Sequence, residues 1–119
     1  MKRQFFLLVS FLVLVSTAWG QEAGVAEAKA ALASDDFAKA RKLFEAAYKE
    51  TPADTTVCYG LAETYLRMQE ASKAEDFVEK VLRQFPDDAI LHLKLGIALN
   101  LRGKFKKAEE EFVRVDELL

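Results

Sequence analysis

A 34-residue periodicity runs through the chain from about residue 21 to its last residues. The small residues Ala40, Ala74 and Ala108 are separated by this interval, and Pro52 and Pro86 share it. Bulkier apolar residues recur at the same distance, as in the set Phe44, Val78 and Phe112. A period of this length, with small and bulky apolar positions alternating, is typical of stacked helical hairpins. The sequence therefore predicts an all-α solenoid without strands.

The repeated small residues have a mechanical explanation. Two helices joined by a short turn pack with their axes about 8–10 Å apart, so a bulky side chain at the closest point would force them open. Each predicted hairpin supplies two small residues for this contact. The pairs are Ala28 with Ala40, Ala62 with Ala74, and Gly96 with Ala108.

The turns between the helices are marked by proline, glycine and aspartate. We expect helices over about residues 23–33, 37–50, 54–68 and 72–84, a fifth that ends at Arg102-Gly103, and a sixth from about residue 104 onward. The second and fourth end before Pro52 and Pro86, because the residue before a proline is pushed out of helical geometry. Asp35-Asp36 and Asp87-Asp88 are predicted to cap the helices that follow them.

The repeated small residue, bulky apolar residue and proline resemble the tetratricopeptide repeat (TPR) family. The resemblance covers residues 21–119 as three repeats, at residues 21–54, 55–88 and 89–119. It implies an α-solenoid of three antiparallel helix-turn-helix hairpins. The first repeat departs from the family pattern, with Gly24, Glu27 and Ala31 where the family prefers a large aromatic, a leucine and a tyrosine.

Residues 1–20 have a different character from the repeats. Lys2 and Arg3 precede an apolar run from Phe5 to Val15, and Ala18 and Gly20 stand before Gln21. This three-part pattern predicts a cleavable secretory signal. Export to a bacterial periplasm or cell envelope, or secretion, follows from it, with no membrane attachment after cleavage. An uncleaved N-terminal anchor is the alternative.

The net charge of the chain bears on the kind of partner that it could bind. Of the 17 basic residues, two lie in the predicted signal, so residues 21–119 carry 15 basic and 19 acidic side chains and a net charge of −4. This mild acidity argues against nucleic acid as a partner.

Cys58 is the only cysteine, so no disulfide can form within the chain. We expect its thiol to be packed in the core.

The resemblance also implies a binding surface, because TPR proteins bind peptides along the concave face formed by the first helix of each hairpin. Several residues fall at positions where related proteins clamp a C-terminal carboxylate, but they are Val25, Gly60, Glu63 and Ile90, so that clamp is absent. The remaining groove is largely apolar and suits a hydrophobic helix or extended segment. The candidate partner-binding residues are Val25, Lys29, Tyr59, Glu63, Leu66, Arg67, Leu93, Ile97 and Leu101.

We therefore expect an exported adaptor that binds a protein or peptide partner in this groove. His92 and Asp88 could supply only two of the three or four ligands that a metal site needs. The sequence also has no motif for catalysis. We therefore predict no enzyme activity, no metal and no cofactor. Apolar residues surround the whole helix at 90–101, which is consistent either with partner binding or with a simple core role. The alternatives are a structural module that forms a homodimer through its C-terminal hairpin, and a fragment of a longer TPR array.

Overall fold

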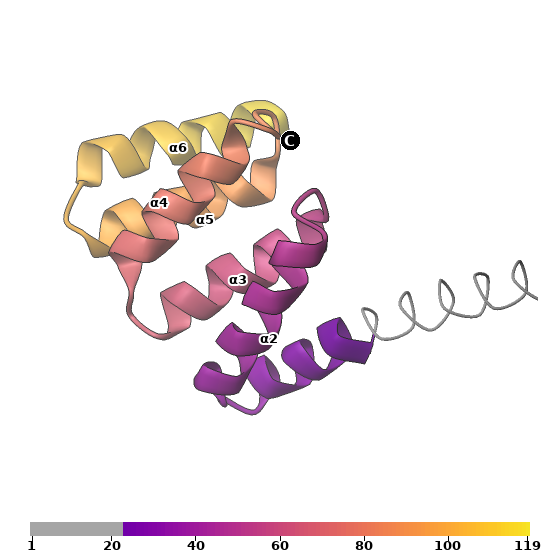
Figure 1. The fold of residues 1–119 in the computed structure, drawn as a ribbon. Helices are drawn as coiled ribbons and strands as arrows, with labels where there is room; N and C mark the ends of the chain where they lie inside the picture. The colour runs from indigo at the N-terminus through magenta and orange to yellow at the C-terminus, as the bar shows by residue number, and fades with distance from the viewer. Residues whose placement is uncertain (1–22) are drawn as a thin grey trace, which may run out of the picture.

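The structure, a computed structural model, describes residues 23–119, and every regular element in that part of the chain is an α-helix. A first helical segment spans residues 23–33. It is followed by α2 (Phe37–Glu50), α3 (Thr55–Arg67), α4 (Ala71–Leu82), α5 (Ala89–Leu101) and α6 (Phe105–Leu118). The helices fold back on one another and stack from residues 23–33 at one end to α6 at the other (Figure 1). The predicted all-α solenoid is confirmed, and the helices fit three hairpins.

The predicted signal segment, residues 1–20, lies outside the described residues. Within residues 23–119, no helix combines the length and the apolar character that crossing a bilayer demands.

Aspartates begin three of the helices, because a carboxylate can accept hydrogen bonds from backbone N–H groups that have no partner within the helix. Asp36 accepts from the Lys39 amide at 3.3 Å, and Asp54 accepts from the Thr56 amide at 3.0 Å. Asp88 accepts from the amide of Leu91 at 3.0 Å. The predicted capping is thus confirmed for Asp36 and Asp88.

The helix ends follow the predicted turns closely. Helix α2 ends at Glu50, two residues before Pro52, and α5 is followed by Gly103 with a φ of 75°. That left-handed conformation costs glycine little, which explains its place after the helix. Helix α4 ends at Leu82, two residues earlier than expected, because the chain turns at 83–84 before Pro86.

The predicted small residues are buried. Ala28, Ala40, Ala62 and Ala74 have no exposed surface, and Ala108 is also buried. Packing between hairpins uses bulky positions of the repeat, and Phe44 and Val78 are both fully buried. The ring of Phe112 lies over Gly96 of its own hairpin and is 36% exposed.

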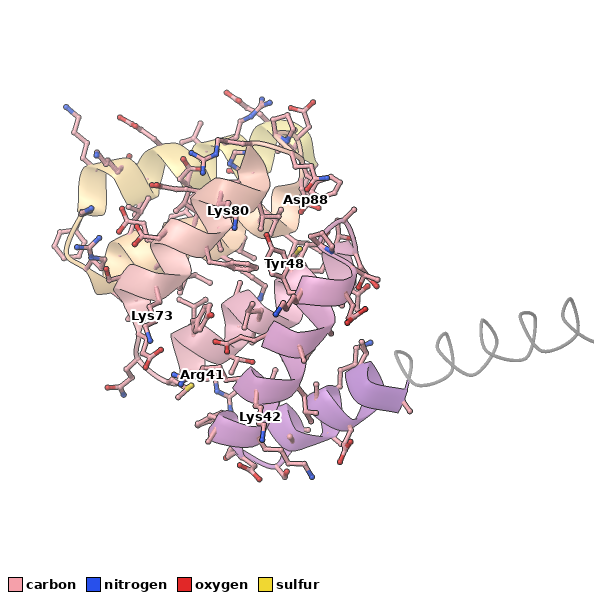
Figure 2. The ribbon with its side chains drawn as sticks, in the orientation of Figure 1. Arg41, Lys42, Tyr48, Lys73, Lys80 and Asp88 are labelled. Carbon is pink, nitrogen blue, oxygen red and sulfur yellow. The ribbon has the colours of Figure 1, made fainter. Side chains whose placement is uncertain are left out.

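Aromatic contacts join the first hairpin to the second. The Tyr48 ring meets the Phe77 ring edge to face, with centroids 5.1 Å apart. Lys80 of α4 also lies over Tyr48, its Nζ 5.6 Å from the ring centroid (Figure 2). Such geometry adds to the area that the rings bury.

Cys58 has the predicted packing role. It is fully buried in the cluster that links α3, α4 and α5, and burial raises the pKa of its thiol to about 11. A thiol with so high a pKa is a poor nucleophile at neutral pH.

Candidate functional site

Helix α5 has two apolar faces, and residues 23–119 cover only one of them. Leu91, Leu95, Ala98 and Leu99 are buried in the clusters that α5 shares with α3, α4 and α6. The other face presents four large apolar residues, each between 37% and 59% exposed. They are spaced by three or four residues and so lie on one stripe of the helix. We call Ile90, Leu93, Ile97 and Leu101 the α5 stripe.

The α5 stripe contains three of the predicted partner-binding residues, Leu93, Ile97 and Leu101. Ile90 completes it and was not among them, although the sequence signal was available, because Ile90 precedes Leu93 by three residues and Ile97 by seven. A stripe of four exposed apolar side chains is typical of an interaction surface on a soluble domain. A partner that covered the stripe would remove its apolar surface from water, and this transfer is favourable by about 25 cal/mol for each Å² buried.

Two other predicted residues instead connect neighbouring hairpins. The Tyr59 hydroxyl donates a hydrogen bond to the carboxylate of Asp88. Burial is the larger cause that raises the pKa of Tyr59, and this hydrogen bond raises it further. Glu63 accepts from Lys94 Nζ at 2.9 Å. Tyr59 and Glu63 of the second hairpin therefore bind residues at the start of and within α5, the first helix of the third hairpin.

Leu66 and Arg67 are also used within the fold. Leu66 is only 8% exposed and packs with Ala74 and Ala98, so its side chain belongs to the core rather than to an exposed surface. The Arg67 guanidinium lies 2.8 Å from Asp35 and 5.3 Å from the centroid of the Phe37 ring. Val25 is half-buried and Lys29 exposed on the first helical segment, away from α5 in the stack (Figure 1).

A buried carboxylate fixes the turn that follows the α5 stripe. Glu75 of α4 accepts hydrogen bonds from Arg102 and, at 2.8 Å, from Lys104. Burial alone would raise the pKa of Glu75, but the hydrogen bonds and charges of Lys104 and Arg102 outweigh it and hold the pKa below its usual value. This contact holds the C-terminal end of α5 against α4.

His92 takes part in the packing of the last hairpin. Its Nδ1 lies 2.6 Å from Glu111 Oε2, and its Nε2 lies 2.6 Å from the Pro86 carbonyl oxygen. A carbonyl oxygen can only accept, so the tautomer or charge state must place a proton on Nε2. Across residues 23–119, no three His, Cys, Asp or Glu side chains gather in a way that could hold a metal ion.

Comparison with known proteins agrees with the repeat architecture. A family model described as "Tetratricopeptide repeat" matches residues 31–92, just over half of the chain. No curated protein sequence matches the chain.

Several solved structures share the fold. The Sgt2 TPR domain from Aspergillus fumigatus superposes with a TM-score of 0.78 at 23% identity, covering 83% of this chain and 66% of that domain. The first TPR domain of human RPAP3 gives a TM-score of 0.77 at 15% identity, covering 82% and 77%.

A third structure contains a bound peptide. It is the second TPR of Spaghetti (RPAP3) bound to the HSP90 peptide SRMEEVD, with a TM-score of 0.76 at 16% identity, covering 83% of this chain and 92% of that one. Sequence identities of 15–23% show only that these structures share the fold with this chain. The match to the family model is what assigns the sequence to a family. The chain belongs to the tetratricopeptide repeat family.

Proposed function

We propose that this chain is an exported protein-interaction adaptor and that the α5 stripe is its docking surface. The observation that carries the proposal is the exposure of Ile90, Leu93, Ile97 and Leu101 on one side of an otherwise buried helix. The peptide held by the structurally similar Spaghetti domain supports a protein as the kind of partner.

The partner segment should be apolar rather than acidic. Three of the last four residues of SRMEEVD, the peptide bound by the Spaghetti domain, are acidic, whereas the α5 stripe offers four aliphatic side chains and no charge. Apolar anchors that fill such a surface supply most of the binding free energy in protein interfaces. Val25 and Lys29, at the opposite end of the stack, stay candidates for secondary contacts.

Binding, rather than catalysis, is the function that the titratable groups support. Among residues 23–119, the side chains with shifted pKa values are Cys58, Tyr59, Tyr65 and Glu75. Each of them is engaged in packing, in a hydrogen bond or in an ion pair between helices. None is left poised toward an open cleft, as a general acid or base would be.

Substitution of the stripe tests the proposal. The double variant Leu93→Ser/Ile97→Ser should weaken partner capture from an envelope extract by tenfold or more, because two desolvated apolar anchors are lost. Ala46→Ser, at an exposed alanine on α2, is the matched control and should bind normally. Equal capture by both variants, with the helical content of each unchanged in circular dichroism, would contradict the proposal.

Export is tested separately. If residues 1–20 are removed as a secretory signal, mass spectrometry of the exported protein will give a chain that begins at Gln21. A membrane-bound product that retains Met1 would show an anchor instead and would place the adaptor at the membrane surface.

A further inference from the structure

Helix α6 exposes a second set of apolar side chains at the end of the stack. Phe105 is 67% exposed, Val113 51% and Phe112 36%. No helix covers them within residues 23–119, and α6 forms the outer edge of the array (Figure 1). The three residues lie on one side of the helix, with Glu109 between them along the chain.

The first hairpin shows what covers such a surface. Phe37 and Phe44 of α2 stand two repeats, or 68 residues, before Phe105 and Phe112. Helix α3 contacts both rings, with the Arg67 guanidinium 5.3 Å from the centroid of Phe37 and Gly60 against Phe44. A Cβ built on Gly60 would lie 2.9 Å from Cδ1 of Phe44 and closer to two other ring atoms. Gly60 and Arg67 are seven residues apart, as are the two rings that they meet.

We propose that α6 receives an amphipathic helix of a partner protein in the way that α2 receives α3. A small residue of that helix lies against Phe112, and an arginine seven residues later stacks on Phe105. The inference rests on the proposed function, because the same helix would border Leu93 and Ile97, the repeat equivalents of Tyr59 and Glu63. It adds the class of partner, its orientation and its sequence pattern.

The charges on α6 predict two further residues of the partner helix. Arg41 of α2, labelled in Figure 2, pairs with Glu70 at 3.5 Å, and the repeat equivalent of Arg41 is Glu109. The sign is inverted, so the partner helix should carry a cation three residues after its arginine. Glu45 of α2 accepts a hydrogen bond from the Tyr65 hydroxyl at 3.0 Å, and its equivalent is Val113. An aliphatic side chain should therefore replace the tyrosine.

A second copy of this chain fits the surface less well. Two-fold pairing centred on the apolar residues of α6 would bring Glu109 against the same residue of the other copy, and like charges in contact oppose association. Head-to-tail stacking of two copies would place the first helical segment of one copy against α6 of the other. That segment carries the charged Glu27, paired with Lys39 at 3.3 Å, at the repeat position where Leu61 and Leu95 are buried. Stacking would therefore bury a charge where the other repeats bury a leucine.

A labelled peptide tests the proposal directly. The probe is the segment at residues 54–70 with three changes, Cys58→Ser, Tyr65→Leu and Glu70→Lys, titrated with the full chain and followed by fluorescence anisotropy. We expect saturable binding. Gly60→Leu in the peptide should weaken it tenfold or more, because the added side chain collides with the Phe112 ring. Phe105→Ser in the protein should also weaken it, since the arginine loses its aromatic partner.

A charge exchange identifies the orientation. Glu109→Lys in the protein should weaken the probe by about threefold, the size expected for an exposed ion pair. A second probe that keeps Glu70 should then bind this variant better than the probe with Glu70→Lys does. Glu110→Lys makes the same charge change on the neighbouring side of α6 and should have a clearly smaller effect.

Several results would overturn the inference. They are failure of the probe to bind, binding that is indifferent to Gly60→Leu and to the charge exchange, and a homodimer in sedimentation equilibrium that Phe105→Ser dissociates. Loss of a captured partner in Leu93→Ser/Ile97→Ser, combined with no effect of Phe105→Ser on that partner or on the probe, would leave the adaptor function standing and remove the α6 site alone.

Discussion

At the scale of single residues, two glycines show how the same substitution can have opposite effects. Gly60 lies against the buried ring of Phe44, and the space for a Cβ is already filled. A Cβ added at Gly24, on the first helical segment, would meet no other side chain within 4 Å among the described residues. Alanine is the better helix former by up to about 1 kcal/mol at either position, so the sign of each effect is set by packing.

Gly60→Ala should destabilise the protein by roughly 1–3 kcal/mol, the usual cost of forcing extra volume into a packed core. Gly24→Ala should leave the free energy of unfolding unchanged or raise it by up to about 1 kcal/mol. Urea unfolding followed by circular dichroism measures both. Equal effects of the two substitutions would mean that Phe44 does not pack on Gly60.

At the scale of helices, the sequence predicted the boundaries well because the signals are local. Asp36 and Asp88 act through backbone amides three residues away, and Gly103 acts through its own φ angle. The site was harder to predict. Leu66 and Tyr59 lie on the expected face of α3, but whether a neighbouring helix covers or engages them depends on how the hairpins stack, which a repeat alignment does not contain.

The contact between α4 and the turn from α5 to α6 predicts a dependence on pH. Glu75 has a folded-state pKa below the unfolded value of 4.5. Between these two values the unfolded chain binds more protons than the folded one. The stabilisation from Glu75 is therefore complete above pH 4.5 and is lost as the pH falls through the folded pKa.

The variant Glu75→Gln isolates this effect. Wild-type protein should lose more stability than Glu75→Gln when the pH is lowered from about 6 to about 3, as measured by urea midpoints at each pH. Glu79→Gln, at an exposed glutamate on the same helix, is the control and should follow wild type. Parallel pH profiles for wild type and Glu75→Gln would show that the buried ion pairs do not lower the pKa of Glu75.

At the scale of the whole molecule, the two ends of the stack differ in character. The first segment carries small or charged residues such as Ala23, Glu27 and Ala30 at positions that are Val57, Leu61 and Thr64 in the second repeat. The last hairpin instead presents the α5 stripe and the exposed side chains of α6. The array is thus polar at its start and apolar at its end, and we expect the partner to be recognised at the apolar end.

Contact between the α5 stripe and a partner is tested most directly by site-specific photo-crosslinking. A photoreactive amino acid is placed at position 97, on the stripe, or at position 46, an exposed site on α2, and cells are irradiated before lysis. We predict a discrete crosslinked protein at position 97 that is absent at position 46 and is lost when Leu93→Ser is added. A crosslink of equal strength at both positions, or one at position 46 alone, would contradict the assignment of the stripe as the docking surface.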